Sequence, residues 1–259
     1  MGDQRRKTRL TTVALAVCLV LLVLFSIIIL MFYPKINIFF LMHRKYEVYG
    51  GMTDELKDSE LFDDMISGKS FCFVGDSITH GSIINGIHWY QPLIPYINGE
   101  ITDFSHGGWS VSNLADTVDN IPDADVYVIA IGINDILFPD EEDSAHTASE
   151  YASKCNELGC QLTTRSSGAK IYFISPWSFA GYDSSVAERG DMFRSALEET
   201  CKTNSYRYIN PDPIIQSVFA KEGSSKYMYN DFHPNAPKGV GLFSYAVLKD
   251  AHDRRLENN

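Results

Sequence analysis

The sequence predicts an α/β protein: a three-layer α/β/α sandwich around a mostly parallel five-stranded sheet, preceded by one N-terminal transmembrane helix. From residue 70 onward, short apolar runs alternate with stretches of helical spacing, which is typical of a parallel sheet. The run at 125–132 is apolar on both faces, as a central parallel strand requires. Residues 10–34 hold no charged side chain and, as a helix, can cross roughly 30 Å of hydrocarbon.

The N-terminal apolar segment is expected to be an uncleaved membrane anchor. Four basic residues precede it and keep the N-terminus in the cytoplasm by the positive-inside rule: Arg5, Arg6, Lys7 and Arg9. A cleavable signal peptide is the alternative, but it would have a shorter apolar core and a small-residue cleavage site, which residues 34–40 do not offer. We expect a cytoplasmic basic tail (1–9), a transmembrane anchor (10–34), a juxtamembrane connector (35–69) and an extracytoplasmic domain (70–259) at the cell membrane.

The part expected to be exported is strongly acidic. Residues 1–49 hold seven Lys and Arg and two acidic residues, which leaves 15 basic and 31 acidic residues in 50–259 and a formal charge of −16. Nucleic acids and other anionic polymers bind basic grooves, so neither is expected as a partner. Solubility alone is a sufficient explanation of the acidity.

The five cysteines indicate neither a metal site nor a required disulfide. None is paired with histidine at a metal-ligand spacing, so no metal is expected. Cys155 and Cys160 fall in a stretch expected to be helical, where five residues rise about 7.5 Å, too far for a disulfide unless the helix breaks between them.

The elements follow one another in an alternating order. Strands are expected at the short apolar runs 71–74, 101–104, 125–132, 170–175 and 206–209. Helices are expected at 55–65, 88–97, 111–118, 143–162, 185–202, 213–220 and 235–256. The sequence shows no repeat or low-complexity tract, and nothing divides 65–259 into two domains.

Ser77 is a candidate nucleophile because of its place at the end of the first strand. Four apolar residues give way there to Gly75, Asp76 and the Ser77 hydroxyl. Open α/β sheets bind their ligands at the carboxyl edge of the strands, so a serine there can face a substrate. Serine is also common as a helix N-cap or turn residue, and this segment alone does not separate the two roles.

Three further stretches fall at the ends of elements. Gly107 and Gly108 follow the second strand and let a backbone N–H approach a ligand, or form a tight turn. Asn134 follows the third strand and on its own marks a turn. His233 lies on a loop before the last helix, where a lone histidine is more often a solvated bystander. Together, a nucleophile, a backbone donor, an amide donor and a histidine meet the requirements of acyl transfer.

This set resembles the SGNH hydrolases, also called the GDSL-like lipase/acylhydrolase family, over about residues 70–256. Four blocks in the family's order and near its spacing carry the resemblance: Gly75-Asp76-Ser77-Ile78-Thr79, Gly107-Gly108, Gly132-Ile133-Asn134-Asp135 and His233-Pro234-Asn235. The resemblance implies the SGNH or flavodoxin-like three-layer fold. It also implies an esterase that needs no metal or organic cofactor.

The resemblance further implies a role for each residue. Ser77 would attack an ester carbonyl, and His233 would take its proton and later give it to the leaving alcohol. The oxyanion would be held by the N–H of Ser77, the N–H of Gly108 and the side-chain amide of Asn134. Each such donor contributes about 10²- to 10³-fold in rate.

One position departs from the family pattern. The family has an aspartate three residues before the histidine, where this chain has Asn230, and the nearest acid is Asp231, two residues before. An amide does not stabilise an imidazolium as a carboxylate does, and in serine proteases that change costs about 10⁴-fold. Either Asp231 supports His233 through a shifted loop, or Asn230 or a backbone carbonyl gives weaker support. We expect the weaker support.

The expected substrate is an acylated carbohydrate or another small ester. Export, together with Trp109, Trp177 and His80 in loops near the sheet edge, favours short acyl groups on sugars, most simply acetyl, over long-chain lipids. Core packing is the competing role for each tryptophan, and helix capping for His80. An O-acetyltransferase that passes the acyl group to a glycan hydroxyl is one alternative. A non-catalytic glycan-binding domain is the other, and Asn230 is its only support.

Overall fold

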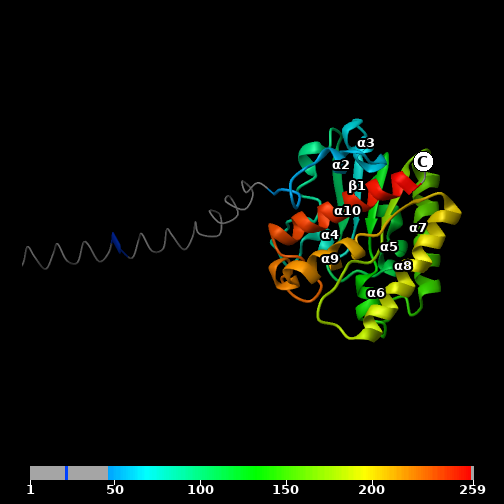
Figure 1. Ribbon diagram of the computed structural model, residues 1–259. Coiled ribbons are helices and arrows are strands. Elements are labelled where there is room, and N and C mark those ends of the chain that lie inside the picture. Colours follow the sequence, from blue (N-terminus) through cyan, green and yellow to red (C-terminus); the bar gives the residue numbers. More distant parts are fainter. Residues whose placement is uncertain (1–20, 23–45, 258–259) are drawn as a thin grey trace, which may run out of the picture. The chain divides into compact units, whose positions relative to one another are not determined.

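The computed structural model describes residues 21–22 and 46–257, and those from Tyr46 onward belong to one compact unit. Its centre is a five-stranded sheet in which neighbouring strands run parallel, in the order β2-β1-β3-β4-β5 (Figure 1). The strands are β1 (Phe71–Gly75), β2 (Ile101–Ser105), β3 (Val126–Ala130), β4 (Lys170–Ile174) and β5 (Arg207–Ile209). The five expected strands are confirmed, and every pairing in this sheet is parallel.

The register brings three loops to one edge of the sheet. Gly75 at the end of β1 pairs with Ser105 of β2 and with Ala130 of β3, so the chain leaves these three strands at the same level. From β1 the chain adds β2 on one side of the sheet, and β3, β4 and β5 follow on the other side. Open α/β sheets bind ligands at this switch point between β1 and β3. The loops that follow β1, β2 and β3 are those that carry Ser77, Gly108 and Asn134.

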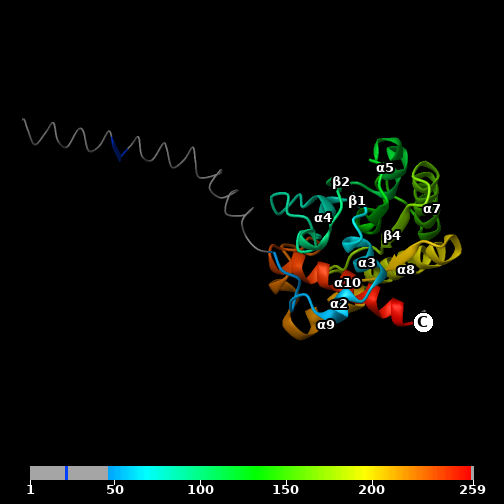
Figure 2. The same cartoon turned by 90° about the horizontal axis from the view of Figure 1, so that it is seen from above.

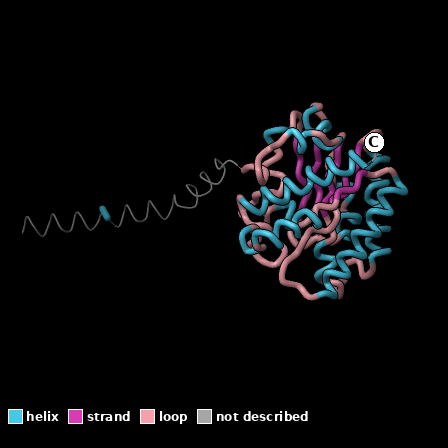
Figure 3. The backbone as a smooth tube through the Cα atoms, viewed as in Figure 1, coloured by secondary structure: helices cyan, strands magenta, loops and turns pink. Residues whose placement is uncertain are grey.

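Helices cover both faces of the sheet. On one face, α5 (Val111–Asp116), α7 (Ala148–Arg165) and α8 (Ser184–Asn204) pack against one another; on the other, α10 (Lys238–Glu257) packs against α2 (Asp54–Lys57), α3 (Glu60–Ile66) and α9 (Asp212–Glu222) (Figure 2). The remaining elements are the short helices α4 (Ser77–His80) and α6 (Ile133–Leu137) and the 3₁₀ turns Ile94–Tyr96, Val118–Asn120 and Ser224–Lys226. Figure 3 shows the resulting layers, with the strands between the helices.

The structure differs from expectation where proline or a polar cap interrupts a helix. Residues 88–97 form turns and a single 3₁₀ turn instead of a helix, because Pro92 and Pro95 lack the N–H that a helix interior needs. The expected helix at 55–65 is two helices, since the Ser59 hydroxyl accepts the N–H of Phe62 and begins α3 anew. In the same way Thr147 caps α7, which therefore begins five residues later than expected.

Residues 46–69 pack onto the domain. Val48, Leu56 and Met65 are buried in its core, and the N–H of Tyr49 donates to the carbonyl of Gly241 in α10 over 3.0 Å. The expected basic tail (1–9) lies outside the described residues, as does the expected anchor (10–34) apart from Leu21 and Leu22. Within residues 21–22 and 46–257, no helix combines the length and the apolar character that crossing a bilayer demands.

Candidate active site

The candidate nucleophile stands where β1 turns into α4. Asp76 caps this one-turn helix by accepting the N–H of Ile78 over 2.9 Å, and Ser77 is its first residue. A Cβ at Gly75 would lie 2.3 Å from the carbonyl oxygen of Ala130, so only glycine lets β1 approach β3 this closely before the turn. Ser77 is 6% exposed, and the capped turn between β1 and α4 fixes its backbone.

The loop before α10 brings His233 to that serine. The distance from Ser77 Oγ to His233 Nε2 is 2.8 Å, although 156 residues separate the two in sequence. Backbone hydrogen bonds close the loop on itself: the N–H of Tyr229 donates to the carbonyl of His233 over 2.9 Å, and the N–H of Asn235 to that of Tyr227 over 2.8 Å. These hydrogen bonds fix the backbone of the loop that carries His233, and the imidazole is buried.

The other imidazole nitrogen meets Asn230. His233 Nδ1 lies 3.2 Å from Asn230 Oδ1 and 3.1 Å from Asn230 Nδ2, and Oδ1 also accepts the backbone N–H groups of Phe232 and His233, over 3.1 and 2.7 Å. Two backbone donors fix which end of the amide is oxygen. When Ser77 donates to Nε2, the proton of the neutral ring is on Nδ1, and Asn230 Oδ1 is its acceptor.

Asp231 does not contact the imidazole. Its carbonyl accepts the N–H of Ala180 over 2.7 Å, and its exposed carboxylate faces Gly181, where an added Cβ would lie 3.2 Å from Oδ1. This geometry favours the weaker support that the sequence analysis expected, from the amide of Asn230.

The other candidate oxyanion donors lie in the loops that follow β2 and β3 and in the first turn of α4. Gly108 has a φ of +81°, a conformation that L side chains rarely adopt. Asn134, 5% exposed on α6, donates from Nδ2 to the carbonyl of Trp109 over 2.7 Å, which leaves the second N–H of its amide for a ligand. The N–H of Ser77 belongs to the first turn of α4, where backbone donors have no partner within the helix.

Comparison with known proteins identifies the family. The model of the GDSL-like lipase/acylhydrolase family matches residues 73–237, well over half of the chain. The chain belongs to this family. Membership makes it an ester-bond hydrolase, as the resemblance of the four sequence blocks implied.

Solved structures share the fold at low sequence identity. An acetyl-xylooligosaccharide esterase of Geobacillus stearothermophilus, Axe2, is similar with a TM-score of 0.62 and 17% identity, over 73% of this chain and 96% of that one. A GDSL-like lipase of Parabacteroides merdae gives 0.62 and 17%, over 72% and 96%. An α/β hydrolase from the metagenome of Lake Arreo, LAE5, gives 0.58 and 17%, over 71% and 95%. No curated protein matches the sequence.

Two buried carboxylates, Asp76 and Asp135, adjoin the candidate site residues in sequence. The sequence analysis assigned neither of them a role. Asp135 accepts the N–H of Val111 over 3.1 Å and the N–H of Ala145 over 2.8 Å, so it ties α6 to the start of α5. Burial raises the pKa of Asp135 to about 6 and that of Asp76 to about 7. Their positions directly beside Ser77 and Asn134 in the sequence were the feature that could have indicated a role for them.

The environment of His233 favours the neutral ring. Burial lowers its pKa to about 4. Neutral imidazole is the form that accepts the Ser77 proton, so the base is ready at neutral pH. The same burial makes the imidazolium that follows costly, and Asn230 offers it a neutral oxygen instead of a charge.

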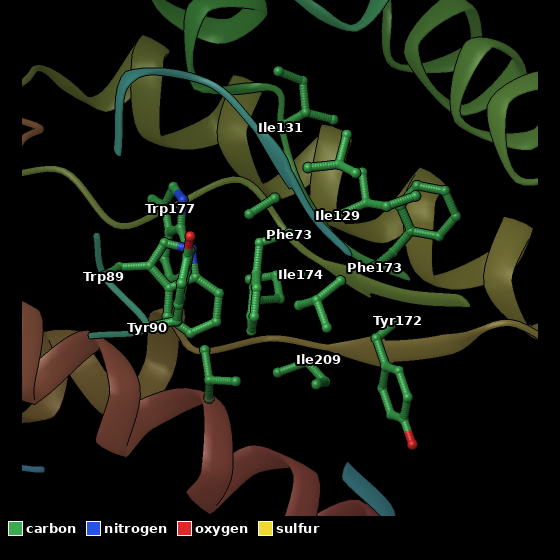
Figure 4. Packing of buried hydrophobic residues seen from close by; sticks show 14 of the residues in the cluster. Phe73, Trp89, Tyr90, Ile129, Ile131, Tyr172, Phe173, Ile174, Trp177 and Ile209 are labelled. Carbon is green, nitrogen blue, oxygen red and sulfur yellow. The ribbon is translucent and has the colours of Figure 1, made fainter. Parts of the chain in front are cut away.

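The three side chains expected to bind substrate separate into two groups. Trp109 and His80 belong to a row of rings beside the Gly107-Gly108 turn. His106 stacks on Trp109 with 3.9 Å between ring centroids, and the His80 ring lies parallel to the His106 ring at 6.4 Å. Trp177 does not reach the site. It is 1% exposed and packs against Trp89 in the core, which corrects the expectation that it binds substrate (Figure 4).

Metal ligands are not gathered at this site. Among residues 21–22 and 46–257, one group brings three such side chains within 4.8 Å of one another: Glu55, His252 and Asp253, on α2 and α10. Lys249 pairs with both of its carboxylates, which compensates their charge.

Proposed function

We propose that the chain is a serine esterase of SGNH type that removes short acyl groups, most simply acetyl, from a carbohydrate. The observation that carries this proposal is the 2.8 Å contact between Ser77 Oγ and His233 Nε2, at the edge of the sheet where the loops with the candidate oxyanion donors begin. Family membership fixes the reaction class, and the site geometry supports the assignment of residues to its steps.

The proposed mechanism uses the contacts described above. Ser77 Oγ attacks the ester carbonyl while its proton passes to His233 Nε2, and the imidazolium formed keeps its Nδ1 proton on Asn230 Oδ1. The N–H groups of Ser77 and Gly108 and the Asn134 amide hold the oxyanion. His233 then protonates the departing alcohol. In the second half, water gives a proton to His233 and attacks the acyl-enzyme, and His233 returns the proton to Ser77 Oγ as the acid leaves.

The surroundings of Ser77 support a short acyl group. Ile78, Gly81, Ile83, Ile84 and Pro234 form a tight, apolar crevice beside Ser77 and His233. The crevice is too narrow to admit a long acyl chain.

Two observations support a carbohydrate as the alcohol part. The rings of His80, His106 and Trp109 stack in a row beside the Gly107-Gly108 turn, and rings with polar tips are suited to contact sugars. The fold is also shared with Axe2, an esterase of acetylated xylo-oligosaccharides.

The proposal includes anchoring in the cell membrane with the esterase domain outside. It rests on the uncharged segment at 10–34 and the four basic residues before it. Expressed in its host, the full chain should sediment with membranes after alkaline carbonate washing, and protease added to intact cells should digest the esterase domain. Recovery in the soluble fraction would contradict the anchor.

The esterase assignment is tested with p-nitrophenyl acetate. We expect the chain to release nitrophenol and Ser77→Ala to reduce kcat by about 10³-fold or more. Ser217→Ala, an exposed serine on α9, is the matched control and should act as wild type. Equal, slow release by wild type and Ser77→Ala would contradict serine catalysis and favour a non-catalytic role.

A further inference from the structure

A second pocket opens beside the catalytic loop. Its volume of about 460 Å³ lies in the range typical of small-molecule sites. The loop after β4, α8 and α9 form its walls. The rings and longer polar side chains of these walls are Phe179, Tyr182, Asp191, Arg194, Asp212 and Gln216.

Asp231 connects this pocket to the catalytic loop. The residue lies two positions before His233, and its carbonyl accepts the N–H of Ala180 over 2.7 Å. Its carboxylate faces Gly181 and, together with burial, raises the pKa of Tyr182. Asp231 therefore stands on the rim between His233 and the pocket, with its carboxylate turned to the pocket side.

The charges in the wall select against anionic ligands. The buried guanidinium of Arg194 lies 3.0 Å from a carboxylate oxygen of Asp191 and 3.4 Å from one of Asp212. Arg194 is the one cationic side chain among the lining residues, and both of these carboxylates already compensate it. With Asp231 on the rim, the pocket presents excess acceptor oxygens and a net negative charge.

The uncharged groups of the wall suit a sugar. Tyr182 is 38% exposed and offers a ring face with a hydroxyl at its tip. Gln216 donates from Nε2 to the carbonyl of Phe179 over 3.2 Å and to Asp212 Oδ1 over 3.5 Å, which leaves its own carbonyl oxygen as an acceptor. Ring faces beside fixed acceptors match a neutral, polyhydroxylated ring.

We propose that this pocket is a saccharide subsite, in which Asp231 and Tyr182 bind a neutral sugar unit next to the acylated one. The inference rests on the proposed function and deepens it, because it makes the substrate an oligosaccharide and gives Asp231 a role in binding. The carboxylate of Asp231 accepts sugar hydroxyls, and the Tyr182 ring covers one face of the sugar.

The binding test does not depend on catalysis. Calorimetric titration of the full chain with neutral trisaccharides (xylotriose, cellotriose and chitotriose) should detect at least one ligand, and trigalacturonate should bind more weakly than that ligand. Asp231→Asn and Tyr182→Ala should each raise Kd by about tenfold. Asp119→Asn, an exposed aspartate before β3 at the opposite edge of the sheet, is the matched control and should bind as wild type.

The kinetic test uses acetylated forms of the bound trisaccharide and of its monosaccharide. Both variants should lower the ratio of kcat/KM between trisaccharide and monosaccharide by about tenfold. Binding of none of the neutral trisaccharides, tighter binding of trigalacturonate, or an unchanged Kd in both variants would overturn the subsite. So would an equal loss in Asp231→Asn on all substrates, p-nitrophenyl acetate included. Failure of the esterase itself shows separately, as equal nitrophenol release by wild type and Ser77→Ala.

Discussion

His233 has a neutral amide where the family pattern has a carboxylate, and this difference should control the rate. Asn230 Oδ1 already accepts the Nδ1 proton and two backbone N–H groups, so an aspartate oxygen fits the same place. We expect Asn230→Asp to raise kcat on p-nitrophenyl acetate by about 10- to 10²-fold. In serine proteases the change from aspartate to asparagine lowers kcat by about 10⁴-fold, so the gain from the opposite change should not exceed about 10⁴-fold.

The same variant should move the pH profile. Burial holds the pKa of His233 to about 4, so kcat/KM of the wild type should fall only as pH drops through about 4, where the base becomes protonated. A carboxylate stabilises the imidazolium, so the acid limb of Asn230→Asp should lie at higher pH. Asn120→Asp, an exposed change in the 3₁₀ turn Val118–Asn120, should alter neither quantity. A slower Asn230→Asp enzyme would show that the amide is required as it stands.

The sequence predicted the site residues that strand register positions, gave only a preference for Asn230 over Asp231, and assigned Trp177 to the site although it lies in the core. Ser77 and Asn134 follow strands directly, so strand register alone brings them to one edge. The choice between Asn230 and Asp231 depends on how a tight loop turns, which spacing does not encode. Trp177 also follows a strand, yet its side chain turns inward to Trp89, and only packing shows this.

At the scale of elements, α6 holds the oxyanion loop through two consecutive side chains. Asn134 binds the carbonyl of Trp109 over 2.7 Å, and Asp135 accepts the N–H of Val111 at the start of α5. We expect Asp135→Asn to lower kcat by about 10-fold or more with little change in KM, because one oxygen acceptor becomes an NH₂ group and a buried N–H loses its partner. The loop that carries Gly108 would then lose its fixed position. Steady-state kinetics with p-nitrophenyl acetate measure the split.

A matched aspartate separates this effect from a general loss of stability. Asp123 pairs with Arg165 over 2.8 Å before β3, at the opposite edge of the sheet. Asp123→Asn should leave kcat unchanged even where it lowers the melting temperature. Should Asp135→Asn lower only the melting temperature and keep kcat, its role would be structural, without control over the oxyanion loop.

Elements were predictable from sequence where a period or an apolar run was long enough. The five strands and the long helices α7, α8 and α10 are confirmed, with shifted ends. The one-turn helices α4 and α6 were not predicted because a single turn shows no helical period. Both follow strands at the site, where a short turn orients Ser77 and Asn134, so the missed elements are functional ones.

At the scale of the molecule, residues 46–69 contribute side chains to the hydrophobic core of the domain and are more than a connector in front of it. The side chains they bury include Val48, Leu56 and Met65. Asp64 is buried too and accepts Lys170 Nζ over 2.8 Å and the Tyr172 hydroxyl over 2.7 Å. Although burial opposes it, the hydrogen bonds from Lys170, Lys69 and Tyr172 lower the pKa of Asp64, so this contribution to stability is present above the ordinary aspartate pKa and is lost as pH falls.

Truncation tests this organisation. A chain of residues 46–259 should unfold cooperatively on heating, whereas one of residues 70–259 should show no cooperative transition. Each large apolar side chain lost contributes about 1.5–3 kcal/mol, and five of them, Val48, Leu56, Leu61, Phe62 and Met65, match the whole stability of about 5–15 kcal/mol of a typical domain. A cooperative transition of the 70–259 chain at the same temperature would show that the segment is only a connector.

Asp64→Asn in the longer chain should lower the melting temperature more at pH 7 than at pH 3. Protonation of Asp64 at low pH removes the stabilisation that its carboxylate gives to the wild type, whereas the amide of the variant is neutral at both pH values.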